Sequence, residues 1–271
     1  MKYKLFISDY DGTLGKAPKN DIDSETLEAI NKFREKGGIF AVCSGRETAS
    51  ISRILKAHSL DGLVVSFQGA RITDLKSGEK LFEGGLDSDT AIKILKEFKN
   101  AGLGPVAYGD NGFFVEEITP YVKGYELATG LTAKVTDVFE VLKKQKSNVS
   151  KVCGLGAESL VDSAIISFNE RYKGTNIKFN SGEKCLLEAI NIECSKGKAV
   201  QFLSKYYGIP LSEVIAVGDS TNDIELLRGE WHGVAVGDGR DELKAVADEI
   251  TVPFDEKPIK YLLEKYCLSD T

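Results

Sequence analysis

Two acids directly follow the first apolar run of the chain, and their spacing points to phosphate or metal chemistry. Asp9 and Asp11 come after the run 5–7 and are followed by Gly12, which allows the backbone to turn sharply. Such a run is typical of a buried parallel strand, and open α/β sheets bind ligands beyond the carboxyl ends of their strands. Two carboxylates this close repel each other, and a hard divalent cation such as Mg²⁺ is the usual remedy. A strand that ends in a polar turn would explain this stretch if it stood alone.

A hydroxyl group follows the next apolar run. Ser44 and Gly45 come directly after the run 39–43 and precede a segment with a helical pattern. A hydroxyl in this place can donate to a phosphate oxygen alongside free backbone N–H groups. The alternative interpretation is that Ser44 only caps the helix. Arg46 either faces an anionic or polyol substrate or pairs with a surface acid.

A lysine stands at the start of a later helical segment. Lys196 precedes Gly197 there, although the helix dipole favours anions at this end. Residues that break a local rule often lie at functional sites. The Lys196 ammonium can bridge a carboxylate and a phosphate oxygen. Lys198 is the competing lysine, and either side chain would serve equally well as an ordinary surface charge.

A polar run follows the apolar segment 214–217. Asp219 stands at that strand end, in the place equivalent to Asp9 on a neighbouring strand. Asn222 and Asp223 come next, at the start of another helical segment. Helix capping explains one of these acids but hardly the whole run.

These four segments resemble the ordered motifs of the haloacid dehalogenase-like (HAD) hydrolases, and the resemblance covers nearly the whole chain. The segments are residues 9–13, 44–46, 196 and 218–223. The resemblance is closest to the Cof-type sugar-phosphate phosphatases, whose second domain, a type-two (C2B) cap, is inserted between motifs two and three. The chain departs from the family pattern at Gln68 and at Asp238, where relatives usually have Asn.

The resemblance implies a Mg²⁺-dependent phosphatase that hydrolyses small phosphate monoesters, sugar phosphates above all, through an aspartyl-phosphate intermediate. Asp9 would be the nucleophile, Asp11 the general acid and base, and Lys196 a third catalytic group. The implied metal-binding set is Asp9, Asp11, Asp219 and Asp223. The implied phosphate- and substrate-binding set is Gly12, Ser44, Gly45, Arg46, Lys196 and Asn222.

The alternation of strands and helices predicts an α/β protein with a doubly wound, parallel, Rossmann-like core sheet. From about residue 86 the pattern changes to short strands with two or three helices. That change predicts an open antiparallel sheet with helices on one face, which is an inserted α+β cap domain. The predicted boundaries are 1–84 and 184–271 for the catalytic core and 85–183 for the cap.

Composition excludes several functional classes. The 271 residues carry a net charge of −6, which argues against nucleic acid as a partner, and no apolar run approaches the length of a membrane-spanning helix. The start of the chain lacks the apolar region of a signal peptide. Five cysteines without C-x-x-C spacing suggest reduced thiols in a cytoplasmic protein, without zinc or disulfides. We expect a small phosphate ester as the partner and a monomer or weak homo-oligomer.

Three other functions fit parts of the pattern. A hexose phosphomutase of the same superfamily would return a 6-phosphate from a hexose 1-phosphate instead of free phosphate. A phospho-accepting signalling module also combines acids, Mg²⁺ and a lysine, but it is half this length and gains nothing from an acid placed like Asp11. A ligand-binding protein with degenerate catalysis would show no turnover on any phosphate ester.

Overall fold

The computed structural model describes residues 1–16, 19–109, 112–145 and 147–269, which fall into two compact units. The first unit comprises Met1–Gly45, Ile51–Lys80 and Ser195–Thr271. The second comprises Arg46–Ser50 and Leu81–Cys194. In the described ranges, no helix has the length and apolarity needed to cross a bilayer. The domain boundaries expected from the sequence stay a prediction.

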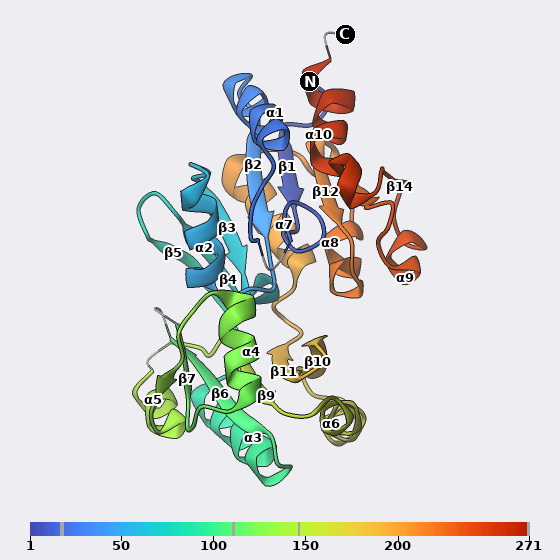
Figure 1. Cartoon of the computed structure of the whole chain (residues 1–271). Coiled ribbons are helices and arrows are strands. Elements are labelled where there is room, and N and C mark those ends of the chain that lie inside the picture. The colour runs from blue at the N-terminus through green and yellow to red at the C-terminus, as the bar shows by residue number, and fades with distance from the viewer. Residues whose placement is uncertain (17–18, 110–111, 146, 270–271) are drawn as a thin grey trace. The chain divides into compact units, whose positions relative to one another are not determined.

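The first unit is built on an eight-stranded sheet with the order β14-β13-β12-β1-β2-β3-β4-β5 (Figure 1). The strands from β14 to β3 pair in parallel, and β4 pairs antiparallel with β3. The bounds are β1 Leu5–Ser8, β2 Ile39–Cys43, β3 Leu63–Ser66, β4 Arg71–Asp74, β5 Lys80–Glu83, β12 Val214–Gly218, β13 His232–Ala235 and β14 Glu249–Ile250.

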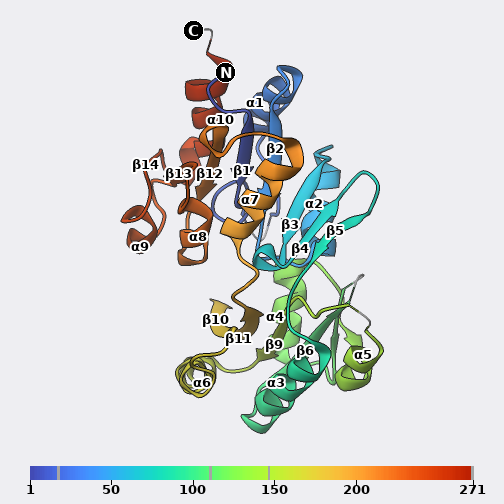
Figure 2. The same ribbon diagram turned by 180° about the vertical axis from the view of Figure 1, so that it is seen from behind.

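Helices cover both faces of this sheet, because its central strands are apolar on both sides. The helices of this part of the chain are α1 Ser24–Glu35, α2 Thr48–Ala57, α7 Lys196–Tyr207, α8 Ile224–Leu227, α9 Asp241–Lys244 and α10 Pro258–Leu263. One face packs Phe6, Val42 and Ile215 against apolar residues of α1, α2 and α10. Helix α7 lies on the other face, as Figure 2 shows. The predicted α/β class with a parallel, doubly wound core sheet is confirmed.

The second unit is a six-stranded sheet with the order β10-β11-β9-β6-β7-β8, antiparallel except where β7 meets β8. Phe98, Phe168 and Phe179 pack together where α3 and α6 cover one face of it. The strands are β6 Gly104–Gly109, β7 Gly112–Val115, β8 Lys134–Val135, β9 Val152–Leu155, β10 Ile177–Glu183 and β11 Leu186–Asn191. The helices are α3 Ser88–Asn100, α4 Pro120–Thr129, α5 Val138–Lys144 and α6 Glu158–Arg171. The α+β class agrees with the expected second part of the fold, although the described residues form four helices here where two or three were expected.

A buried ion pair lies on the other face of this second sheet. The Lys151 ammonium donates to the Glu188 carboxylate, and the two side chains are only 3% and 4% exposed. Glu188 is in β11, and Lys151 directly precedes β9, which pairs with it. The Lys151 ammonium also lies 5.2 Å from the centre of the Tyr108 ring. Neither charge has water to solvate it, so each depends on the other.

Removing one member of this pair should destabilise the protein strongly. Glu188→Leu leaves the Lys151 ammonium buried without a counter-charge, and we expect a loss of about 3–5 kcal/mol in the free energy of unfolding. The double variant Lys151→Met/Glu188→Leu should recover most of that loss. Urea unfolding measures both. Glu170→Leu is the matched control, because Glu170 pairs with Lys173 at the surface; an equal effect there would contradict the argument.

Candidate active site

The two strands that lead into the predicted site are neighbours in the sheet. β1 and β12 pair in parallel with Ser8 opposite Val217, and the Asp9 backbone N–H donates to the Val217 carbonyl over 2.9 Å. Asp9 and Asp219 therefore leave the sheet at the same edge. The Asp9 carboxylate is almost completely buried, with 4% of the residue exposed. A carboxylate in that position needs a compensating charge.

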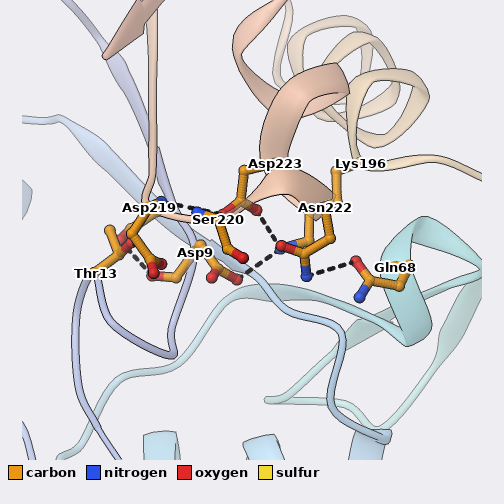
Figure 3. A network of polar contacts seen from close by, with 9 residues as sticks. Asp9, Thr13, Gln68, Lys196, Asp219, Ser220, Asn222 and Asp223 are labelled. Carbon is orange, nitrogen blue, oxygen red and sulfur yellow. Dashed lines mark hydrogen bonds and ion pairs between the residues drawn. The ribbon is translucent and has the colours of Figure 1, made fainter. Parts of the chain in front are cut away.

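Lys196 supplies that charge. Its ammonium lies 2.7 Å from Asp9 Oδ1 and 2.5 Å from Asp223 Oδ1, so one lysine joins two acids that are far apart in the sequence (Figure 3). Burial lowers the pKa of Lys196, but the Asp223 and Asp9 carboxylates outweigh it and hold that pKa above its ordinary value. Burial and the nearby Asp223 charge raise the pKa of Asp9, while Lys196 acts against that rise. Lys196 thus remains a cation and offsets part of the cost of burying Asp9, although the pKa of Asp9 stays well above its ordinary value.

Asp223 is held by the backbone as well as by Lys196. Its Oδ2 accepts hydrogen bonds from the backbone N–H groups of Asp219 and Ser220, over 3.1 Å each. The bond from Ser220 is part of a capping box at the start of the turn Thr221–Asp223. A side chain at Gly218 would collide with the Asp223 carboxyl group. These contacts use both oxygens of Asp223, so this residue orients the strand end of β12.

Asp219 is positioned from the other side by the turn after β1. The Thr13 hydroxyl donates to Asp219 Oδ1 over 2.9 Å. Gly12 has a φ of +80°, and a Cβ there would strike the Asp219 carboxylate, so a glycine is required. Burial, followed by the Asp223 charge, raises the pKa of Asp219 to about 6. The charge of Asp11 adds a smaller contribution to the same rise.

The donor set of this cluster fits a divalent cation. One carboxylate oxygen from each of Asp9, Asp219 and Asp223 lies within 4.8 Å of the others. Lys196 offsets one of these three charges, so two negative charges remain in a largely buried site. Oxygen ligands from one or two carboxylates are what Mg²⁺ takes in proteins, together with water and phosphate oxygens.

The other predicted residues occupy defined places. Ser44 and Gly45 follow β2, the neighbour of β1 on the side opposite β12, and Ser44 is buried. Asn222 lies beside Asp223 in the same turn, and Asp11 follows Asp9 in the turn after β1. Arg46 is partly buried and belongs to the segment Arg46–Ser50 of the second unit, so its predicted substrate contact stays a prediction.

Three residues contribute to the site without having been predicted from the sequence to do so: Thr13, which donates to Asp219, Ser220 and Gln68. The Ser220 hydroxyl and the Asp223 carboxylate form a capping box, and a Ser followed three residues later by an acid was the available signal. Gln68 was noted only as a departure from the family pattern, whereas its carboxamide touches Asn222. No local pattern identifies that contact, because the two residues are 154 positions apart.

Neutralising Asp219 should stabilise the metal-free protein and remove its response to Mg²⁺. Because the pKa of Asp219 is raised from 3.8 to about 6, ionising it costs folding free energy as the pH rises through that range. Asp219→Asn should therefore gain about 1–3 kcal/mol at about pH 8, a gain that disappears toward about pH 4. Thermal unfolding should show that Mg²⁺ stabilises the wild type but not this variant.

The matched control is Asp241→Asn, because the Asp241 side chain is 98% exposed. It should leave both the stability and the Mg²⁺ response unchanged. An Asp219→Asn protein that Mg²⁺ stabilises as it does the wild type would remove Asp219 from the metal site.

Comparison with known proteins agrees with this geometry. A profile of the haloacid dehalogenase-like hydrolases matches residues 6–263. The HMP-PP phosphatase of Citrobacter koseri is 28% identical over 250 residues, which cover 92% of this chain and 89% of that protein. A crystal structure of a haloacid dehalogenase-like hydrolase from Bacteroides thetaiotaomicron is similar with a TM-score of 0.86 and 26% identity, covering 97% of this chain and 99% of that one.

A sugar phosphatase of HAD subclass IIB shares the fold, with a TM-score of 0.81 and 22% identity over 97% of this chain and 98% of its own. The family profile spans far more than half of the chain and includes all four motif segments. The predictions of this family and of a hydrolase are confirmed. The chain belongs to the haloacid dehalogenase-like hydrolases.

Proposed function

We propose that the protein is a Mg²⁺-dependent phosphatase that hydrolyses small phosphate monoesters, sugar phosphates above all, through an aspartyl-phosphate on Asp9. The observation that carries this proposal is the buried contact of Asp9 with Lys196, inside a carboxylate cluster suited to a divalent cation. A carboxylate held this way is shielded from water, paired with a cation and placed at the end of the sheet where ligands bind. The relatives named as HMP-PP phosphatase and sugar phosphatase support this reaction class.

Asp9 and Asp11 divide the chemistry between them. A carboxylate oxygen of Asp9 attacks phosphorus, a new P–O bond forms, and the P–O bond to the alcohol breaks. Asp11 gives its proton to the departing alkoxide, then takes a proton from the water that attacks the aspartyl-phosphate. That second attack breaks the bond between Asp9 and phosphorus and releases inorganic phosphate. Asp9 and Asp11 are then ready for another cycle.

The remaining residues bind and neutralise the transferring group. Lys196 and Ser44 hold phosphoryl oxygens, together with backbone N–H groups near Gly12 and Gly45. Asn222 contacts the phosphoryl group or the bound substrate, and Arg46 contacts the rest of the substrate.

The side chains of Asp9 and Asp219 and the backbone carbonyl of Asp11 would hold Mg²⁺, with Asp223 supporting them. When bound, the ion neutralises charge on the phosphoryl oxygens. A cytoplasmic location and a monomeric or weakly associated state stay predictions.

The nucleophile is tested by Asp9→Asn. The wild type should release phosphate from a panel of sugar phosphates when Mg²⁺ is present. EDTA should abolish this release, and added Mg²⁺ should restore it. Asp9→Asn should show no turnover, because an amide does not attack phosphorus, while its circular dichroism stays that of the wild type. Retained activity would refute the assignment, and isomerised sugar phosphate in place of free phosphate would indicate a mutase.

The general acid and base is tested by Asp11→Asn. Loss of proton transfer should slow turnover by about 10²–10⁴-fold. Substrates with good leaving groups do not need the proton in the first step, so they should accumulate phosphorylated enzyme, which rapid acid quench and intact-protein mass spectrometry detect. A variant that turns over normally would exclude Asp11 from proton transfer.

A further inference from the structure

A strained turn lies next to the site, between β3 and β4 of the first unit. Phe67, Gln68 and Gly69 have φ angles of +53°, +58° and +100°, so three consecutive residues are left-handed and two of them are not glycine. Such backbone persists only where the surroundings hold it, and it concentrates at functional sites. The residues that contact this turn are therefore the ones that hold it in its strained conformation.

The turn is held between two parts of the proposed phosphate site. The Gln68 backbone N–H donates to the Ser44 carbonyl over 3.2 Å. A Cβ at Gly69 would collide with the Ser195 carbonyl, so this glycine packs directly against the residue that precedes Lys196. The guanidinium of Arg71 stacks on the Phe67 ring at 5.3 Å from its centre. The turn thus contacts both the residue that follows β2 and the residue that precedes α7.

The Gln68 side chain extends from this turn into the site. The residue is 8% exposed, and a Cβ at Gly45 would lie 2.3 Å from its amide nitrogen, so Gly45 leaves room for the Gln68 side chain in this position. Its Oε1 accepts a hydrogen bond from Asn222 Nδ2 over 3.5 Å. Figure 3 shows this contact. Asn222, by contrast, is exposed. The buried carboxamide of Gln68 thereby restrains the exposed carboxamide of Asn222.

We propose that Gln68 is a positioning residue that sets the affinity of the phosphoryl group by orienting the Asn222 carboxamide. This inference rests on the proposed function, in which Asn222 contacts the phosphoryl group or the substrate bound to it. An exposed amide loses rotational freedom when a ligand binds it, and that loss weakens binding. A side chain already held by Gln68 has less freedom to lose.

A double-mutant cycle read out by phosphate binding tests this inference. Inorganic phosphate is titrated calorimetrically into the Mg²⁺-loaded wild type, Gln68→Met, Asn222→Ala and the double variant. Methionine keeps the length of glutamine but removes the acceptor. Gln68→Met should weaken phosphate binding by about 3- to 10-fold, the effect of one lost hydrogen bond. It should add nothing in the Asn222→Ala background, because the two residues act as one unit.

Kinetics and a matched control separate positioning from a folding defect. Gln68→Met should raise KM for a sugar phosphate at unchanged kcat, whereas a partly unfolded enzyme would lose kcat at unchanged KM. Gln201→Met is the control, because Gln201 is exposed on α7, and it should alter neither constant.

Two results would overturn the inference while the proposed function stands. One is wild-type phosphate affinity in Gln68→Met, and the other is the same weakening in both backgrounds. A wild type that neither binds phosphate nor hydrolyses any ester would instead overturn the proposed function, and this inference with it.

Discussion

The site depends on one ammonium group placed between two buried carboxylates. Without Lys196, the carboxylates of Asp9 and Asp223 would be two like charges in a region that water barely reaches, with no opposite charge beside them in the part of the chain that the structure describes. With it, both carboxylates contact a cation, and the cost of burying Asp9 is partly offset. The ammonium does not balance the whole cluster, since Asp219 is also present. That remaining imbalance makes the site receptive to a divalent cation.

The backbone around the cluster is arranged to tolerate this charge. Parallel pairing of β1 with β12 places Asp9 and Asp219 at one edge. One oxygen of Asp223 accepts hydrogen bonds from backbone N–H groups, and the other accepts one from Lys196. The Asp223 side chain is therefore fixed in one orientation. Gly12 and Gly218 leave room where any side chain would strike a carboxylate. The charged residues thus lie at the ends of rigid strands, and the short turns that follow fix the orientation of their side chains. Charges preorganised in this way lower a reaction barrier, because they need not rearrange during the reaction.

The turn of Phe67 to Gly69 extends this arrangement beyond the charged groups. Each left-handed residue other than glycine costs on the order of 1 kcal/mol, so the surrounding packing must stabilise the turn. Its neighbours are Ser44, Gly45 and Ser195, which belong to the segments that would bind a phosphoryl group.

Much of this could be derived from the sequence, because the decisive signals are local. Apolar runs that end abruptly in polar residues predicted the strands and placed Asp9, Ser44 and Asp219 at their ends. Helix α4 was not expected, since it contains Gly124 and leaves Leu127 80% exposed, so it lacks a clear apolar stripe. The family resemblance favoured Lys196 over Lys198, but the residues alone left both open.

Only the tertiary structure decided which groups meet. Lys196 is buried against Asp9 and Asp223, and Lys198 is exposed, because residues two apart on a helix point in different directions. The paired contacts of Asp223 and the approach of Gln68 to Asn222 depend on how distant segments pack. Sequence determines which residues end a strand or begin a helix, through patterns a few residues long. Contacts between segments 150 or more positions apart arise only when the sheet brings them together.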